Sequence, residues 1–431
     1  MIPRQPPESI AIPARSAVDA AIQAPPSKSL TIRAMAAAAL GSGASTLRGA
    51  LIAEDTELMA AAIRRLGIEV SVEGSTIVVH GTGGSLPAAR AELDLGNAGT
   101  PLRLLTAICC LGSGRFVLDG TARMRQRPVR DLVDALAHLG VQIQTSNGDG
   151  CPPIEILARG LPGGLVRLKG EVSSQYLSAL LLAGPYAGSE LILEVEGRLV
   201  SRPYVDLTIQ TIERFGGRVE REGYERFKVA SGVSYSPRDL TIESDASSAS
   251  YFFAAAAITG GRVRVGGIPP DSLQGDLRFL DLLARMGCRV RRSPGEIVVE
   301  GAGLKGIDAD LSDTPDVAPT LAAVGLFAEG VTRMTGIAHL RVKESDRIAG
   351  IAACVTALGG QADPRPDGLS VMPPSGGRRG LRGARIDPRG DHRLAMAFAV
   401  AGLAVPGVVI LDPACVAKSF PGFFESLHAL A

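Results

Sequence analysis

One signal recurs along the chain at a nearly constant interval, and it limits the possible folds more than any other feature. An apolar residue and a glycine, followed by a β-like run, recur at intervals of 73, 76, 71 and 72 residues. The glycines of this signal are Gly67, Gly140, Gly216, Gly287 and Gly359. An amphipathic helix precedes each glycine, which stands where a left-handed residue would end that helix. Such a period indicates repeated supersecondary units.

A second, alanine-rich helix is predicted upstream in each unit. These helices are anchored at Lys28, Asn97, Ser173, Asp245, Pro315 and Asp391. They are apolar on all sides, so we expect them to be buried. The run after each glycine, such as residues 68–81 or 288–301, predicts two strands and a turn. A solenoid is the alternative architecture, but its repeats are usually about 20–50 residues long. A longer βαβαββ-like unit favours compact domains.

The two ends of the chain indicate how the six units are divided. The last unit ends after its second helix, at residues 423–431, with no strands following. The segment 9–14 could supply a missing strand, which would close the chain on itself. Because 431 residues exceed one ordinary core, we predict two α/β domains of three units each. One spans residues 27–244, and the other is discontinuous and combines residues 1–26 with 245–431.

Composition excludes several classes of protein. A net charge of +1 argues against a general binder of nucleic acid or of anionic membranes. No stretch reaches the roughly 18 apolar residues of a membrane span, and the N-terminal segment lacks the pattern of a signal peptide. Six cysteines without metal-ligand spacing predict reduced, buried thiols. We therefore expect a cytoplasmic protein that holds neither a metal nor a cofactor.

Basic and polar residues gather at the predicted helix starts. Helix N-termini present free N–H groups and a partial positive charge, so they bind phosphates and carboxylates. The starts of the buried helices carry Lys28, Ser29, Arg33, Asn97, Arg103, Ser173, Ser174, Gln175 and Arg393. The second helices begin near Arg127, Ser201, Arg202, Tyr204, Arg341, Lys343, Arg347 and Lys418. Arg127 precedes Pro128, which is expected at the first position of its helix. The pattern predicts a site for small phosphorylated carboxylic acids.

Two carboxylates stand among these cations. Asp316 lies at the start of a buried helix, and Glu344 lies between Lys343 and Arg347. Acid–base chemistry needs such groups close to surrounding charge. The sequence has no phosphate-binding P-loop, no serine-hydrolase elbow and no zinc-protease motif. These absences argue against nucleotide hydrolysis, serine hydrolysis and zinc proteolysis, and they leave arginines and lysines to handle the electrophile.

The motifs resemble those of the enolpyruvyl transferases, and among them the 5-enolpyruvylshikimate-3-phosphate synthases. The matching runs are PSKSLTIRA, LGNAGTPLR, RQRPVRDLVDAL, VSSQYLSALL, SRPYVDL, SDASSASYF, PDVAPTLA, RVKESDR, DHRLAMAF and KSFPGFF. They stand in the family's order and span nearly the whole chain. The resemblance implies a two-domain inverse α/β barrel of six βαβαββ units that closes around its substrates.

The resemblance also implies a reaction and a set of contacts. The 5-hydroxyl of shikimate 3-phosphate would attack phosphoenolpyruvate, with Asp316 as base and with Glu344 and Lys28 moving protons. Phosphoenolpyruvate would be held by Lys28, Gly99, Arg127, Gln175, Arg347, Arg393 and Lys418. Shikimate 3-phosphate would be held by Lys28, Ser29, Arg33, Ser173, Ser174, Gln175, Ser201, Tyr204, Asp316 and Lys343. No metal is implied, and a monomer without macromolecular partners is expected.

The sequence departs from the family pattern at two places. His339 stands where the family commonly has Asn, and Pro101-Leu102-Arg103-Leu104 follows the glycine-rich turn where the family often reads Ala-Met-Arg-Pro. The second departure bears on how tightly the inhibitor glyphosate fits, whereas Gly99 is retained. Inhibition by glyphosate is expected.

Two alternatives remain at this stage. The sister enolpyruvyl transferases act on UDP-N-acetylglucosamine and usually carry a reactive Cys or Asp in a mobile loop. The corresponding stretch, residues 120–129, has neither. A non-catalytic anion-binding relative is the other alternative, and it is expected to lack Lys28, Asp316, Glu344 or Lys418.

Overall fold

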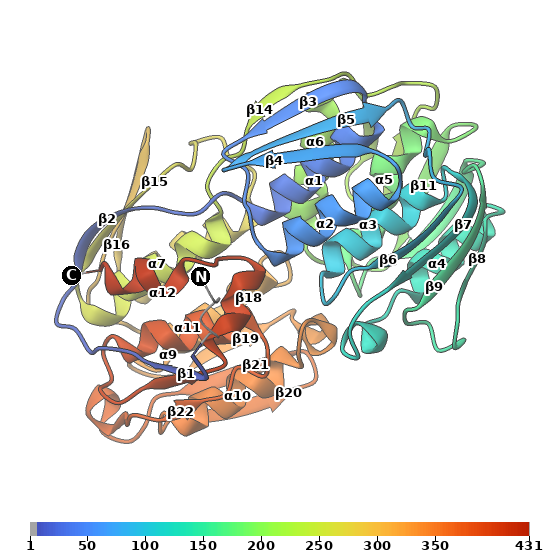
Figure 1. Ribbon diagram of the computed structural model, residues 1–431. Coiled ribbons are helices and arrows are strands. Elements are labelled where there is room, and N and C mark those ends of the chain that lie inside the picture. Colours follow the sequence, from blue (N-terminus) through green and yellow to red (C-terminus); the bar gives the residue numbers. More distant parts are fainter. Residues whose placement is uncertain (1–6, 431) are drawn as a thin grey trace. The chain divides into compact units, whose positions relative to one another are not determined.

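The computed structural model describes residues 7–430, and these form two compact units. One unit, here called the central unit, comprises residues 26–243. The other, called the terminal unit, combines residues 1–25 with 244–431 and so holds both ends of the chain. These bounds differ by one residue from those drawn from the sequence. Figure 1 shows the elements of both units along the chain.

The central unit contains six α-helices and twelve strands in the described part of the chain. The helices are α1 (Lys28–Leu40), α2 (Glu54–Arg65), α3 (Gly99–Cys109), α4 (Arg130–His138), α5 (Ser174–Ala183) and α6 (Arg202–Arg214). The strands are β3 (Ser42–Arg48), β4 (Glu69–Glu73), β5 (Thr76–Thr82), β6 (Arg90–Asp94), β7 (Ser113–Asp119), β8 (Gln142–Thr145), β9 (Ile154–Arg159), β10 (Gly164–Lys169), β11 (Leu191–Glu196), β12 (Val219–Glu222), β13 (Arg226–Val229) and β14 (Asp239–Thr241).

The terminal unit has the same kinds of element within its described residues. Its helices are α7 (Ala246–Thr259), α8 (Phe279–Met286), α9 (Ala318–Gly325), α10 (Arg347–Ala357), α11 (His392–Gly402) and α12 (Phe423–His428). Its strands are β1 (Ser9–Ala11), β2 (Asp19–Gln23), β15 (Arg262–Gly266), β16 (Arg289–Ser293), β17 (Glu296–Glu300), β18 (Asp308–Asp310), β19 (Thr332–Thr335), β20 (Gln361–Arg365), β21 (Gly368–Met372), β22 (Arg385–Ile386) and β23 (Val409–Leu411).

Five of the six sheets repeat one topology. In each, a parallel pair of strands is followed by an antiparallel hairpin, as in the orders β6-β7-β9-β8 and β18-β19-β21-β20. The sixth sheet lacks the hairpin, and the N-terminal strand β1 pairs with β23 in its place. The prediction that the N-terminal segment completes the last unit is therefore confirmed.

At each of the two places where the chain passes from one unit to the other, the strand before the crossing pairs with a strand that lies far away in the sequence. Strand β2 precedes α1 in sequence, yet it pairs in parallel with β15 of the terminal unit. Strand β14 precedes α7, yet it pairs in parallel with β3 of the central unit. The crossings fall at residues 25–26 and 243–244. The terminal unit thus takes β2 from the chain before the first crossing, and the central unit takes β14 from the chain before the second crossing.

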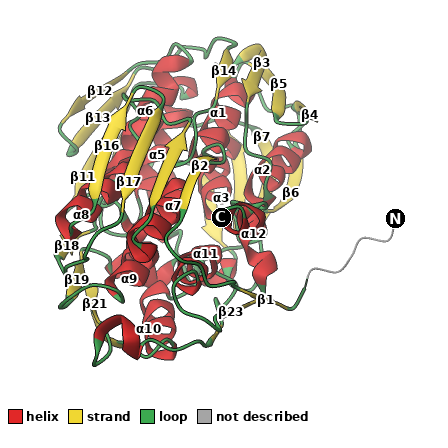
Figure 2. Ribbon diagram, turned by 90° about the vertical axis from the view of Figure 1, so that its left-hand side faces the viewer, coloured by secondary structure: helices red, strands yellow, loops and turns green. Residues whose placement is uncertain are grey.

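The alanine-rich helices form the centre of each unit. In the central unit α3 packs against both α1 and α5, and in the terminal unit α7, α9 and α11 contact one another. Every residue of α7 and of α11 is buried. Helix α7 packs against strands β15 and β17, and Figure 2 shows it next to the sheet that contains β17. Small side chains allow this close approach of helix to helix and helix to sheet, and the predicted burial is confirmed.

The periodic glycines end the amphipathic helices as expected. Gly67, Gly140 and Gly216 have φ values of 86°, 92° and 90°, and Gly287 and Gly359 have 116° and 93°. Only glycine adopts this region without a steric penalty. The second helix of the second unit begins later than predicted, because Val129 is not yet helical (φ −136°, ψ 2°) and α4 starts at Arg130. Pro128 therefore precedes the helix.

The described residues hold no helix that is both long enough and apolar enough to cross a membrane. The cysteine prediction holds for four of the six thiols, which are buried, whereas Cys151 and Cys415 are half-buried. None of the six forms a disulfide.

Close packing of strand β17 on helix α7 predicts a specific sensitivity at Gly301. A Cβ atom there would lie 2.2 Å from the carbonyl oxygen of Ala256, which belongs to buried backbone. We expect Gly301→Ala to lower the free energy of unfolding by about 1–3 kcal/mol, as overpacking does. Gly303→Ala is the matched control, because its Cβ meets nothing within 4 Å. Denaturant titration of both variants checks this, and equal midpoints would contradict it.

Candidate active site

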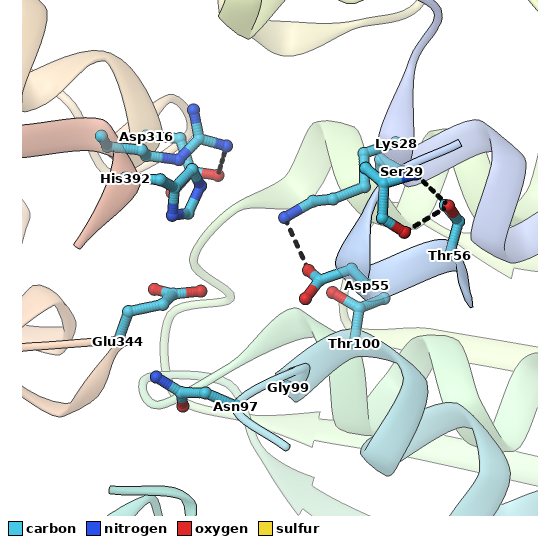
Figure 3. A network of polar contacts seen from close by, with 12 residues as sticks. Lys28, Ser29, Asp55, Thr56, Asn97, Gly99, Thr100, Asp316, Glu344 and His392 are labelled. Carbon is cyan, nitrogen blue, oxygen red and sulfur yellow. Dashed lines mark hydrogen bonds and ion pairs between the residues drawn. The ribbon is translucent and has the colours of Figure 1, made fainter. Parts of the chain in front are cut away.

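The start of α1 holds a lysine against a buried carboxylate. Ser27 caps the helix by accepting a hydrogen bond from the Leu30 amide. The next residue, Lys28, places its Nζ 2.9 Å from Oδ2 of Asp55, which lies in the first turn of α2. Figure 3 shows the two side chains pointing at each other. Asp55 is 2% exposed and Lys28 15%, so the ammonium is fixed in direction while part of it stays accessible.

Arg33, one turn further along α1, is fully enclosed. Its guanidinium donates to the Ser29 hydroxyl at 2.5 Å, to Thr208 Oγ1 at 2.8 Å and to the Tyr204 carbonyl at 3.1 Å. Burial lowers the pKa of Arg33 to about 10. The arginine thereby fastens α1 to α6 and orients Ser29.

The start of α3 has no side-chain cap and is surrounded by guanidinium groups. The N-cap residue Ala98 supplies no side-chain oxygen to the helix. A Cβ on Gly99 would lie 2.4 Å from NH2 of Arg127 and 2.5 Å from NH1 of Arg103. Arg127 donates to the carbonyl and side-chain oxygens of Asn97 at 2.8 and 3.0 Å. Uncapped helix N–H groups beside two cations make a site for an anion.

Arg103 ties this start to that of α5. Its NH1 donates to the Gly99 carbonyl and to Oε1 of Gln175, at 3.1 and 3.2 Å. The amide of Gln175 in turn donates to Thr100 Oγ1 at 3.1 Å. Arg103 is 4% exposed. The departure from the family pattern at Pro101-Leu102-Arg103-Leu104 thus keeps an arginine that orders two helix starts.

The starts of α5 and α6 present hydroxyl groups. Ser173 caps α5 by accepting from the Gln175 amide, and Ser174 follows it, 3% exposed. Ser201 precedes α6 in the left-handed region, with φ 56° and ψ 39°, and is 4% exposed. A buried non-glycine residue in this conformation is strained, and such strain gathers at functional sites. Tyr204 lies in the first turn of α6.

The predicted residues of the terminal unit meet around one arginine. Arg347, 1% exposed, places its three nitrogens against three carboxylates. NH1 lies 2.9 Å from Oδ1 of Asp316, NH2 lies 2.7 Å from Oε2 of Glu344, and Nε lies 2.8 Å from Oδ2 of Asp391. Burial lowers the pKa of Arg347, but the three anions outweigh it and raise that pKa above its usual range.

Asp316 links this arginine to a second one. It lies in a 3-10 turn, η4 (Pro315–Val317), directly before α9. Its Oδ2 accepts from NH2 of Arg393 at 2.7 Å, while its Oδ1 accepts from Arg347. Burial raises the pKa of Asp316, but the charges of Arg393 and Arg347 prevail and hold it well below the usual range. Asp316 is therefore an anion at neutral pH.

The remaining predicted residues lie on short turns of the same unit. Lys343 follows the turn η5 (Ala338–Val342), and its charge acts on Asp316. Lys418, 4% exposed, ends the turn η7 (Pro413–Lys418). His339, in η5, is 6% exposed, and its Nε2 has no hydrogen-bond partner. Burial and then the charge of Lys343 lower the pKa of His339 to about 3, so the imidazole is neutral.

Three buried carboxylates near the predicted residues were missed as site residues: Asp55, Asp276 and Asp391, of which Asp391 was named only as a helix start. Asp55 stands in an acidic first turn, a pattern that ordinarily reflects the helix dipole. Asp276, 4% exposed, stands in the turn η3 (Gly275–Arg278), and the sequence gives no sign of its neighbours. No local sequence signal marks Asp55 or Asp276. Of residues 7–430, no group of three or more His, Cys, Asp or Glu side chains is placed to hold a metal ion.

Comparison with known proteins identifies the family of this chain. A family model described as EPSP synthase (3-phosphoshikimate 1-carboxyvinyltransferase) matches residues 12–427. A 3-phosphoshikimate 1-carboxyvinyltransferase of Methanoculleus marisnigri is 46% identical over 95% of this chain and 96% of its own length. One from a Marinomonas species is 42% identical over 98% and 99%.

Solved structures agree with the fold. An EPSP synthase from Acinetobacter baumannii superposes with a TM-score of 0.80 at 29% identity and 98% coverage of both chains. The enolpyruvyl transferase NikO from Streptomyces tendae gives 0.75 at 20% identity, covering 97% of this chain and 96% of its own, and supports the fold alone. The fold class predicted from the sequence, a two-domain α/β protein of repeated units, is confirmed.

The space around Gly99 predicts how a methyl group would affect anion binding. Gly99→Ala would displace the guanidinium groups of Arg127 and Arg103, both of which are hydrogen-bonded to backbone oxygens. We expect affinity for inorganic phosphate to fall about tenfold, the loss of one charge-assisted hydrogen bond. Calorimetric titration measures it, with Gly303→Ala as the control. Unchanged affinity in Gly99→Ala would contradict an anion site at this helix start.

His339 predicts a pH dependence of stability. Its pKa is about 3 in the folded protein and about 6.5 in an unfolded chain. Between these values the unfolded state binds a proton that the folded state does not, so stability falls as pH falls. Lowering the pH from 7 to 5 should cost about 2 kcal/mol through this residue. Denaturant titrations should show that loss removed by His339→Asn and retained by His80→Asn, which changes an exposed histidine.

Proposed function

The chain belongs to the EPSP synthase (3-phosphoshikimate 1-carboxyvinyltransferase) family, and we propose that it transfers the enolpyruvyl group of phosphoenolpyruvate to the 5-hydroxyl of shikimate 3-phosphate, releasing phosphate. The observation that carries this proposal is the cluster in which one carboxylate, Asp316, accepts from Arg347 and Arg393 at once. It supplies a carboxylate that is ionised at neutral pH, next to cations that suit a substrate carboxylate.

The central unit is proposed to hold the phosphate groups. Support comes from the uncapped start of α3, where Arg127 surrounds Gly99, and from the ammonium of Lys28. Together with Gln175 these groups would bind the phosphate of phosphoenolpyruvate, with Lys418 of the terminal unit assisting. The hydroxyl-bearing starts of α5 and α6, with Ser173, Ser174, Ser201 and Tyr204, would bind the phosphate of shikimate 3-phosphate. Ser29 and Arg33 would bind its carboxylate.

The terminal unit is proposed to move protons and to hold the phosphoenolpyruvate carboxylate. Arg347 and Arg393 would bind that carboxylate with their planar guanidinium groups. Asp316 and Lys343 would contact the ring hydroxyls of shikimate 3-phosphate. Asp316 is an anion at neutral pH, but Arg347 and Arg393 hold its pKa low and so make it a weak base. Pairing of these two arginines with the substrate carboxylate would raise that pKa and let Asp316 accept the proton.

The proposed reaction is an addition followed by an elimination. The 5-oxygen forms a bond to C2 of phosphoenolpyruvate while its proton passes to Asp316, and C3 receives a proton by way of Glu344 with Lys28 assisting. In the tetrahedral adduct the bond from C2 to the phosphate oxygen then breaks, and C3 returns one proton. The products are the enol ether and inorganic phosphate. The proposal uses no metal or cofactor; the monomeric state, the cytoplasmic location and inhibition by glyphosate remain predictions from the sequence.

Phosphate release by the purified protein tests the proposal. With phosphoenolpyruvate present, we expect release to require shikimate 3-phosphate and to be absent with UDP-N-acetylglucosamine. Glu344→Gln and Asp316→Asn should each lower kcat by about 10²–10⁴-fold, the usual contribution of a general acid or base. Asp308→Asn, at an exposed carboxylate of the same unit, is the control and should keep full activity.

Other outcomes would change the conclusion. Release with the nucleotide sugar alone would keep the fold and overturn the acceptor. No release with either acceptor, from folded protein that binds phosphoenolpyruvate, would favour the non-catalytic relative. Full activity of Asp316→Asn would remove the base from the mechanism.

A further inference from the structure

The turn η3 fastens the start of α7 to the segment that leads to Asp316. On one side, Gln274 accepts from the Ala246 amide at 2.9 Å and donates to the Ser244 carbonyl at 2.7 Å. On the other side, Arg278 donates to Oδ2 of Asp313 at 2.8 Å, three residues before Asp316. A displacement of η3 would therefore reach two helix starts of the terminal unit.

Asp276 lies at the middle of this turn and is directed into the protein. It is 4% exposed, and its Oδ2 accepts a short hydrogen bond from the hydroxyl of Ser247, in the first turn of α7. The run that contains Ser247 matched the family pattern in the sequence, yet the proposed mechanism gives none of its residues a role. Asp276 is thus a buried titratable residue, hydrogen-bonded to Ser247, to which the proposed reaction gives no role.

The charged groups around Asp276 come from three elements. Asp245 caps α7, Asp316 lies in η4, and Arg393 lies in the first turn of α11. The charges of all three act on the carboxyl of Asp276. If Asp276 were an anion, it would add a second negative charge beside the arginine that already pairs with Asp316 at 2.7 Å.

We propose that Asp276 is a positioning residue of the terminal unit, which anchors the start of α7 through Ser247 and, as a neutral acid, leaves the charge of Arg393 to Asp316 and to an anionic substrate. This inference rests on the proposed function, because the anionic substrate is taken to be phosphoenolpyruvate. Burial and then the charge of Asp316 raise the pKa of Asp276 to about 7, although Arg393 and the bond from Ser247 oppose the change. The neutral acid is therefore well populated at neutral pH.

The pH profile of the Michaelis constant tests the proposal. Above pH 7 the wild-type carboxyl ionises and weakens the hold of Arg393 on phosphoenolpyruvate. We expect KM for phosphoenolpyruvate to rise about fivefold between pH 6 and 8.5 relative to Asp276→Asn, which stays neutral. Ionisation of phosphoenolpyruvate itself affects KM equally in the wild type and in Asp276→Asn, so it drops out of the ratio of the two KM values. Asp271→Asn, an exposed carboxylate five residues earlier, is the control and should follow the wild type.

Ser247→Ala gives an independent variant, in case Asp276→Asn folds poorly. The Ser247 hydrogen bond favours the charged form of Asp276 and lowers its pKa. Removing the hydroxyl raises that pKa, so the rise of KM should move to higher pH. The proposal is overturned if Asp276→Asn follows the wild-type profile, or if Ser247→Ala leaves the profile where it was.

A measurement of stability separates this inference from the proposed function. Between about pH 4 and pH 7 the folded protein keeps a proton on Asp276 that the unfolded chain has lost, so the contribution of Asp276 to stability falls as pH rises, opposite in sign to the contribution of His339. Asp276→Asn should lack that fall and Asp271→Asn should keep it. A wild type that releases no phosphate with shikimate 3-phosphate defeats the proposed function, whereas equal pH dependence of stability in wild type and Asp276→Asn defeats the neutral acid.

Discussion

A single buried guanidinium, that of Arg347, organises the terminal unit. Removing a charge from water costs several kcal/mol unless it is paired and hydrogen-bonded. Arg347 meets this cost with carboxylates from three segments: Asp316 before α9, Glu344 before α10, and Asp391 at the cap of α11. Breaking such a network by removing one member leaves an uncompensated charge. The positions of three helix starts are therefore coupled through one side chain, and no proposed catalytic group of this unit can be moved alone.

The N-termini of the helices differ in whether a side chain caps them. Side chains of Ser27, Ser173, Asp245, Asp346 and Asp391 accept hydrogen bonds from the first turns of their own helices. Such caps satisfy N–H groups internally. The start of α3 has no such cap, and Arg127 and Arg103 lie where a Cβ of Gly99 would be. Several other helices also lack a side-chain cap, so the glycine and the two guanidinium groups beside it are what set the start of α3 apart.

Most of the fold could be predicted because its signals are local and repeated. A glycine with positive φ ends each amphipathic helix, and an alanine-rich run forms each buried one. What the sequence did not predict depends on contacts between distant segments. The pairing of β2 with β15 and of β14 with β3 is of this kind, and so is the pairing of Asp55 with Lys28, 27 residues apart. Ser247 and Asp276 are 29 residues apart. No short-range pattern distinguishes these carboxylates from ordinary surface residues.

The two units differ in how the charges at their helix starts balance, and this difference is consistent with the proposed division of roles between them. The helix starts of the central unit carry Lys28, Arg33, Arg103 and Arg127, whereas one carboxylate there, Asp55, is buried, and it pairs with Lys28. This excess of positive charge suits substrate phosphates, which bring charge of the opposite sign.

In the terminal unit the positive charges of Lys343, Arg347, Arg393 and Lys418 are opposed by Asp316, Glu344 and Asp391. A nearly balanced cluster binds a monoanionic carboxylate less strongly, but its own carboxylates can take up and return protons. In such a cluster the ionisation of one more carboxyl group, that of Asp276, makes the net charge more negative. Among the cations of the central unit, the ionisation of one carboxyl group would be offset by the excess of positive charge.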